Sequence, residues 1–291
     1  MHERAPALAG RYGVLFVLAA FFVAPLLFMV SSSFKPDTQI FEDLRSVRAF
    51  LPVGDVSLDN YAAVFQRSAL PRYLLNSAII SAITVTLGIL VNSLAAFGLQ
   101  RMTWRGRDLA LAFILALLVI PFELTALPLM LIVSGLPWVG FEDGAFVWRA
   151  SWFDTLHVQI VPFVANAFTI FLFYQFFKDI PEDLDDAARM DGARPLQIYW
   201  HVVLPNSGPA IATSAILLFL SMWNQYLWPI LVVQGQSVRP VMVGLQQFFG
   251  PTNAWGEIMA YATLVTLPVL AVFVAFQRQF VQSVVGAGLK G

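Results

Sequence analysis

Six apolar runs, each long enough to cross a lipid bilayer, constrain this 291-residue chain more than any other feature of its sequence. A spanning helix needs about 20 mostly apolar residues. Because the bilayer core offers no water to backbone amides and carbonyls, such runs are stable there as helices. The predicted spans cover residues 12–30, 73–99, 108–133, 156–177, 209–233 and 256–280. The sequence therefore predicts an all-α membrane protein with six transmembrane helices.

Composition supports a polytopic membrane protein. Hydrophobic residues make up 58% of the chain and charged residues only 12%, whereas about a quarter of the residues of a soluble domain are charged. The absence of cysteine excludes a disulfide framework and a cysteine metal site. The formal net charge of -1 gives no indication of nucleic-acid binding. We expect three parts: 1–72 with the first span and an outer loop, a transmembrane core at 73–280, and a tail at 281–291.

Basic residues predict the orientation of the spans. Arg101, Arg105 and Arg107 crowd into the short loop 100–107, and short loops rich in lysine and arginine face the cytoplasm. With this loop inside, both termini are cytoplasmic in a bacterial inner membrane, and the loops at 31–72, 134–155 and 234–255 face outward. The run at 12–30 exceeds the apolar core of about 7 to 15 residues of a signal peptide, so we expect an uncleaved first span.

A polar insert at 179–205 separates the fourth and fifth spans. Its six carboxylates and two arginines exclude it from hydrocarbon, so it is predicted to lie in water on the cytoplasmic side. Pro181 suits the first position of a helix, and Gly192 supplies a left-handed stop. Pro195 then begins a second short helix. A helix with small exposed residues fits a groove on another protein, and a solvated connector is the alternative.

The order of residues within the insert also resembles a known pattern. The insert resembles the EAA loop of ABC-importer permeases in three successive groups of residues. They are Asp186-Ala187-Ala188, then Asp191-Gly192-Ala193, and then Val202, Leu204 and Pro205. That pattern is E-A-A, two residues, D-G-A, eight residues and I-x-L-P. The spacing from Ala193 to Val202 holds, while Asp186 replaces glutamate and Val202 replaces isoleucine.

This resemblance implies a permease subunit of the maltose or carbohydrate type, in which the insert is a coupling helix docked on a separate ATPase. The sequence has no G-x-x-x-x-G-K-[ST] phosphate loop, so no cofactor is expected on this chain, and ATP and Mg are expected on two partner ATPase subunits. A second permease subunit and an extracytoplasmic binding protein complete the implied assembly, and the tail is similar to one that reaches the ATPases. The residues expected to couple to the ATPase are Asp186, Ala187, Ala188, Asp191, Gly192, Ala193 and Pro205.

The run from Trp223 to Pro229 looks like the span-five signature of carbohydrate permeases. Aromatic faces and amides suit a neutral polyol, although adjacent helical residues point about 100° apart and cannot all face one cavity. Asn224 is the main candidate for the substrate path, and a structural amide beside an interfacial tryptophan belt is the alternative. The further candidates are Gln225, Trp223, Asn166 and Asn92, with Asn76 after them.

Other function classes are weighed against the importer. A secondary transporter uses intramembrane acids or repeated broken spans. Glu123 is the one carboxylate away from the ends of the predicted spans, and it lies nearer the outer interface than the midplane, where it can reach water or cap backbone freed by prolines. A membrane enzyme needs a catalytic cluster, whereas the three histidines are scattered. Within the importers, a mono- or oligosaccharide is expected as substrate, with glycerol 3-phosphate or its diesters as the alternative.

Overall fold

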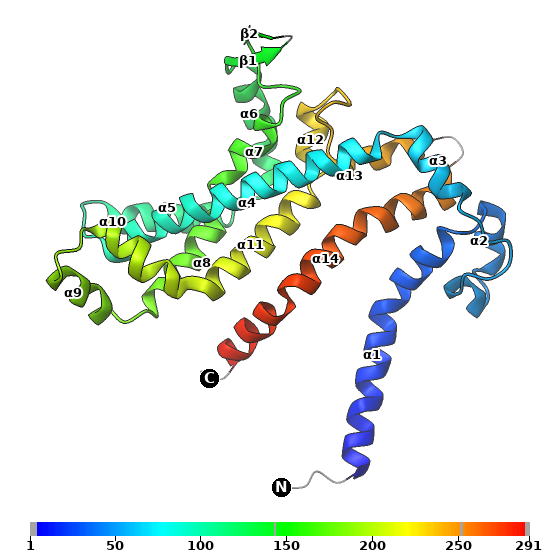
Figure 1. Cartoon of the computed structure of the whole chain (residues 1–291), viewed down its shortest axis with the longest axis horizontal. Coiled ribbons are helices and arrows are strands. Elements are labelled where there is room, and N and C mark those ends of the chain that lie inside the picture. Colours follow the sequence, from blue (N-terminus) through cyan, green and yellow to red (C-terminus); the bar gives the residue numbers. More distant parts are fainter. Residues whose placement is uncertain (1–4, 143, 251–252, 289–291) are drawn as a thin grey trace. The chain divides into compact units, whose positions relative to one another are not determined.

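The computed structural model describes residues 5–142, 144–250 and 253–288 (Figure 1). The chain divides into two compact units. The first unit comprises residues 1–70 and 244–270, and the second comprises residues 71–243 and 271–291. Two helices, α4 and α14, have residues in both units.

The first unit contains the predicted first span as α1, Ala5–Ser32. Most of its large apolar side chains from Tyr12 to Val30 are exposed, as expected of a helix that faces lipid. The loop 31–72 contains short helices. They are α2 (Asp37–Asp43), the 3-10 helix η1 (Val47–Phe50) and α3 (Asp59–Arg67), and the unit also holds η4 (Leu245–Phe248) and the first part of α14 (Trp255–Gly288).

Charged side chains hold the segments of this first unit together. The Lys35 ammonium, 1% exposed, donates to Asp43 Oδ2 at 3.0 Å and to the Arg48 carbonyl at 2.6 Å. The hydrogen bond from Lys35 lowers the pKa of Asp43. Asp37 accepts from the amides of Trp255 and Gly256 at 3.2 and 2.7 Å and so caps the start of α14. A loop that the sequence predicts on the outer side thus buries a paired lysine.

The second unit is built on α4, Leu70–Arg101, which packs beside α8 and α11. Its apolar core joins Phe97 of α4, Phe173 and Phe177 of α8 (Ala167–Lys178) and Ala210 of α11 (Gly208–Trp223). Tyr199 is fully buried in this core, and its hydroxyl lies 2.8 Å from Ser93 Oγ. The end of α4 is therefore packed against the segment that contains the polar insert.

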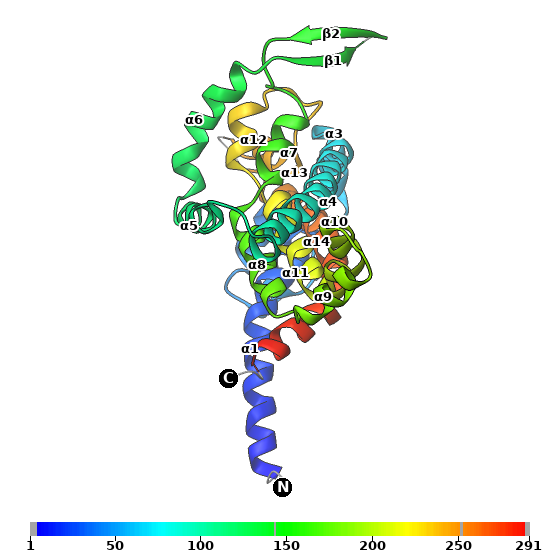
Figure 2. The same cartoon turned by 90° about the vertical axis from the view of Figure 1, so that its left-hand side faces the viewer.

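Three of the predicted spans are broken. The third consists of α5 (Arg107–Leu117) and α6 (Phe122–Ser134), which meet at 105° (Figure 2). Pro121 lies at the start of α6, and the exposed Glu123 is in its first turn, where a carboxylate is favourable. The fourth span breaks between α7 (His157–Val164) and α8, and the fifth breaks between α11 and α12 (Leu227–Val232). Among the described residues, four helical segments can span a membrane, or six if each bent pair counts as one span.

A β-hairpin that the sequence analysis did not predict lies in the loop 134–155 of this otherwise helical fold. Strands β1 (Trp138–Glu142) and β2 (Ala145–Arg149) pair antiparallel, with Trp138 opposite Arg149 (Figure 1). Tryptophan and valine favour strands, and Gly144 supplies the positive φ of the turn. At the other end of the chain, α14 continues to Gly288 within the predicted tail 281–291, whose residues 289–291 lie outside the described part.

Amide side chains supply hydrogen-bond partners to the backbone groups at the break of the fourth span. Asn92, fully buried on α4, donates to the Val164 carbonyl at 2.9 Å and accepts from the Asn166 amide at 2.8 Å. Asn166 begins α8 and accepts from the Thr169 amide at 2.9 Å. Because neither lipid nor the helix can supply these partners, the two asparagines maintain the break.

Replacing Asn92 with leucine should destabilise the protein by about 2–4 kcal/mol, because the Val164 carbonyl and the Asn166 amide lose their buried partner. Unfolding of the purified protein in a denaturing detergent measures this change. Asn206→Leu is the control, since the Asn206 side chain is exposed and makes one local bond to the Val202 carbonyl. Equal stability of the two variants would contradict a structural role for Asn92.

Candidate functional site

The polar insert forms two short helices at one end of the second unit. Helix α9 spans Asp183–Met190 and α10 spans Pro195–Ile198 (Figure 1). Helix α9 begins two residues after Pro181, with Glu182 before it. From α10 the chain continues through a π-helical turn (Tyr199–Val203) and a 3-10 turn (Pro205–Ser207) into α11, with a bend of 42°. The predicted helix, break and second helix are all present.

The break between α9 and α10 is a glycine-dependent helix end. Gly192 has φ +82, the Gly192 amide donates to the Arg189 carbonyl, and the Ala193 amide donates to the Ala188 carbonyl. These two bonds define the Schellman motif that terminates helices. A Cβ at Gly192 would meet no atom within 4 Å. Backbone conformation, not crowding, therefore requires glycine here.

Helix α9 has one buried face and one open face. Ala188 and Ala193 pack against the apolar core, and Asp185 is 1% exposed. On the other side Asp186, Ala187 and Met190 are exposed, and Asp186 pairs with Arg189 at 2.6 Å. Of the coupling residues predicted from sequence, Asp186, Ala187 and Asp191 thus lie on the surface. Ala188 and Ala193 hold the helix in place.

One arginine from the end of α4 reaches beneath this insert. The Arg101 side chain is 2% exposed. Its Nη2 donates to the carbonyls of Phe177 and Ile180 at 2.8 and 2.7 Å, at the end of α8, where carbonyls lack helical partners. The Phe177 carbonyl also accepts from the Ile180 amide at 3.2 Å. Its Nη1 lies 3.5 Å from Glu182, and its Nε lies 3.5 Å from Asp185.

Arg101 contacts the carboxylates of Glu182 and Asp185 at longer distances than the two carbonyls. Burial raises the pKa of Asp185, and the positive charge of Arg101 opposes that rise. At 3.5 Å the ion pairs exceed hydrogen-bond length, and Arg101 Nε and Nη1 and Asp185 Oδ1 have no hydrogen-bond partner. A cavity of 380 Å³ borders the cluster and is lined in part by Arg101, Arg189 and Ala193.

Sequence analysis missed the role of Arg101 and Asp185. The positive-inside rule accounted for Arg101 as one of three arginines in a short loop, and Asp185 read as one of several solvated acids. Neither residue carries a signal in the sequence that separates it from its neighbours. Only the packing of α4 against α8 and α9 brings them together.

The span-five signature lies at the break between α11 and α12. Trp223 and Trp228 are 3% and 0% exposed, and the Trp228 indole donates to the Val158 carbonyl at 2.8 Å. Asn224 ends α11 with an exposed side chain that donates to the Leu220 carbonyl at 2.8 Å, and Gln225 beside it is partly buried. The tryptophans therefore serve packing, while the two amides and the exposed Tyr226 are the accessible polar side chains.

The other amide candidates make backbone contacts. Asn92 and Asn166 hold the break of the fourth span, as described above. Asn76 donates to the carbonyls of Ser237 and Arg239 at 3.0 and 2.9 Å, and so anchors the segment that follows α12. Within the described part of the chain, no hydrogen bond joins any of these three side chains to Asn224, and all three bind main-chain groups.

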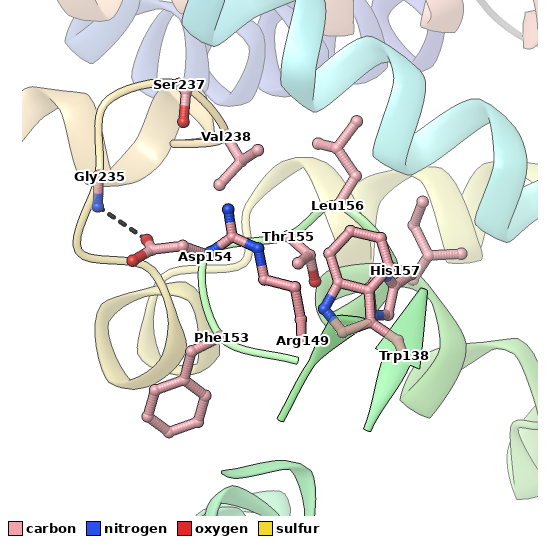
Figure 3. A pocket seen from close by; sticks show the side chains of 11 residues that line it. Trp138, Arg149, Phe153, Asp154, Thr155, Leu156, His157, Gly235, Ser237 and Val238 are labelled. Carbon is pink, nitrogen blue, oxygen red and sulfur yellow. Dashed lines mark hydrogen bonds between the residues drawn. The ribbon is translucent and has the colours of Figure 1, made fainter. Parts of the chain in front are cut away.

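A pocket of 620 Å³ lies between the β-hairpin, the start of α7 and the segment after α12 (Figure 3). Most of its polar groups already have structural partners. Asp154 Oδ1 accepts from the amides of Gln234 and Gly235 at 2.7 and 2.8 Å, and the Trp138 indole donates to Ser151. His157 is packed against Trp138 and Trp152 with ring centroids 4.6 and 4.9 Å away. These contacts tie the hairpin to the neighbouring loop.

The described residues contain no group of three or more His, Cys, Asp or Glu placed to hold a metal ion. The cluster around Arg101 is instead an ion-pair network with one cation and two carboxylates. Its chemistry is suited to holding helices together, because it offers neither a nucleophile nor a metal ligand set.

Comparison with known proteins gives relatives along the whole chain. The chain is 29% identical to the arabinooligosaccharides transport system permease protein AraQ of Halalkalibacterium halodurans, covering 99% of both chains. It is 30% identical to the lactose transport system permease protein LacG of Rhizobium radiobacter, covering 95% of this chain and 94% of that one. It is also 30% identical to the sn-glycerol-3-phosphate transport system permease protein UgpE of Yersinia enterocolitica, covering 94% and 92%.

The fold is also that of a solved transporter. A chain of a bacterial ABC transporter involved in the import of the polysaccharide alginate superposes with a TM-score of 0.75 at 22% identity, covering 96% of this chain and 98% of that one. Residues 84–286 match the family described as binding-protein-dependent transport system inner membrane component. This protein belongs to that family, the permease subunits of ABC transporters.

Proposed function

We propose that this protein is the transmembrane permease subunit of an ATP-driven importer of mono- or oligosaccharides, and that α9 is the helix on which an ATPase subunit docks. The observation that carries the proposal is the two-sided character of α9. Its Asp185 side is buried against the membrane helices, while Asp186, Ala187 and Met190 are open on the other side. A small, partly apolar helical face suits a groove on a partner.

The path from α9 to the membrane is short. The Schellman turn at Gly192 fixes the angle between α9 and α10, and α10 continues through the turns at 199–207 into α11. Closure of two ATPases on ATP would displace α9, and α10 and α11 would carry the displacement into the span that ends at Asn224. Alternating access then follows from rigid-body movement of packed helices.

The proposed orientation places the insert in the cytoplasm. Arg101 contacts the carbonyls of Phe177 and Ile180, so the arginine-rich loop 100–107 and the polar insert lie at the same end of the second unit. By the positive-inside rule that end is cytoplasmic. ATP and Mg would be bound by the separate ATPase subunits, and a second permease and an extracytoplasmic binding protein would complete the assembly.

Carbohydrate is the proposed substrate because the relatives AraQ and LacG are named for arabinooligosaccharide and lactose transport. The accessible amides of Asn224 and Gln225 suit sugar hydroxyls. The substrate path would be shaped by the packing of Trp223 and by the backbone contacts of Asn166 and Asn92. The second candidate is sn-glycerol 3-phosphate, which the similarity to UgpE supports.

Transport by the purified complex in proteoliposomes tests the proposal. We expect uptake of a radiolabelled sugar to require internal ATP and the binding protein, and to persist when proton and sodium gradients are dissipated. Uptake driven by an ion gradient without ATP would contradict the importer. A binding protein that binds glycerol 3-phosphate and no saccharide would contradict the proposed substrate while leaving the ATP requirement intact.

Gly192→Val should uncouple ATP hydrolysis from transport. A β-branched residue in the left-handed conformation costs about 1–2 kcal/mol or more, so the angle between α9 and α10 changes. We expect the sugar transported per ATP hydrolysed to fall about tenfold, which corresponds to 1.4 kcal/mol of coupling.

Gly192→Asn is the matched control, because asparagine tolerates a positive φ and a side chain at this position meets no neighbour. This variant should retain most of the coupled transport. If Gly192→Asn and Gly192→Val lost coupling equally, the backbone angle would not be the property that matters.

A further inference from the structure

We propose that Arg101 is a positioning residue that makes α9 move together with the membrane helices α4 and α8. The inference rests on the proposed coupling function of α9. It concerns how the docking helix α9 is connected to the helix bundle, and it is argued from the contacts at the start of α9.

Arg101 is the side chain on which three helices converge. It is the last residue of α4, it donates two hydrogen bonds to carbonyls at the end of α8, and it forms ion pairs with the carboxylates at the start of α9. An arginine can do this because its planar guanidinium presents several donors in fixed directions. Lysine offers a single charged point on a flexible stem.

Other contacts hold α9 only weakly. Helix α9 has eight residues, which is too short to be stable alone in water. Its apolar contact with the core comes from Ala188, with Ala193 after the turn, and a cavity of 380 Å³ separates part of α9 and α10 from the end of α4. Packing therefore leaves one side of the helix unsupported, and the ion pairs are the strongest connection on that side.

Burial makes this connection hard to break. Arg101 and Asp185 have side chains 2% and 1% exposed, so separating them would cost the buried Asp185 carboxylate its neighbouring cation. A displacement of α9 therefore draws Arg101 along, and the two short bonds from Nη2 transmit it to the end of α8.

The test compares Arg101→Met with Arg105→Met in the complete transporter. Both variants remove one positive charge from the loop 100–107, but Arg105 is exposed, and among the described residues no hydrogen bond or ion pair joins it to the insert. We expect Arg101→Met to assemble with the ATPases and hydrolyse ATP, while the sugar transported per ATP falls about tenfold. Arg105→Met should behave like the wild type.

A distance measurement separates positioning from general stability. The chain has no cysteine, so paired spin labels can be placed at Met190 of α9 and Leu109 of α5, which are 89% and 77% exposed. In the wild type the distance between the labels should be the same in the nucleotide-free and ATP-bound complexes, because α9 moves with the bundle. In Arg101→Met the distribution should broaden and should differ between the two states.

Arg101→Met/Asp185→Leu keeps the proposal falsifiable if the single variant fails to fold. The double variant leaves no unpaired charge in the interior, so it should assemble, and it should remain uncoupled because the link to α8 is absent. Coupled transport within about twofold of the wild type in the double variant, or an unchanged distance distribution in Arg101→Met, would overturn the proposal. In either case the wild type would still transport, whereas failure of the proposed function would remove ATP-dependent transport from the wild type itself.

Discussion

The structure depends on one constraint: a backbone amide or carbonyl that leaves a helix inside a bilayer must find its partner within the protein. Several backbone groups of the second unit find such a partner in a side chain from another segment. Asn92 holds the break between α7 and α8, the Trp228 indole binds the Val158 carbonyl, and Asn76 binds the segment after α12. Arg101 does the same at the end of α8 with a charged group. Buried polar and charged residues therefore stabilise several of the places where helices end or break.

The broken spans relate the fold to the proposed transport function. A straight helix bundle is rigid, whereas broken spans let helix segments turn about defined points. Helix α9 lies outside the bundle, and the α10–α11 segment leads from it to the break beside Asn224. Movement imposed on α9 thus has a continuous route to the middle of the fifth span. The small residues on the open face of α9 and the glycine at its end suit a helix that binds in a groove of another protein.

Sequence analysis predicted the membrane class, the apolar segments, the two short helices of the insert and the stop at Gly192, because hydrophobic length and glycine conformation are local properties. It did not predict the 105° bend before α6, the hairpin at 138–149 or the burial of Lys35 and Asp185. Those features depend on contacts between residues far apart in the sequence. Arg101 and Asp185 are separated by a long stretch of chain, so no local pattern relates them. The amides Asn92 and Asn166 read equally well as ligands or as structural groups until their backbone partners were located.

Crosslinking from α9 tests the central claim most directly. A single cysteine at Ala187, in a chain that has none, carries a short photoreactive probe in the assembled transporter. The account predicts a crosslink to the ATPase subunit, with a yield that changes between the nucleotide-free and ATP-bound states. A probe that reacts with the extracytoplasmic binding protein, or with no nucleotide-binding partner in either state, would contradict it.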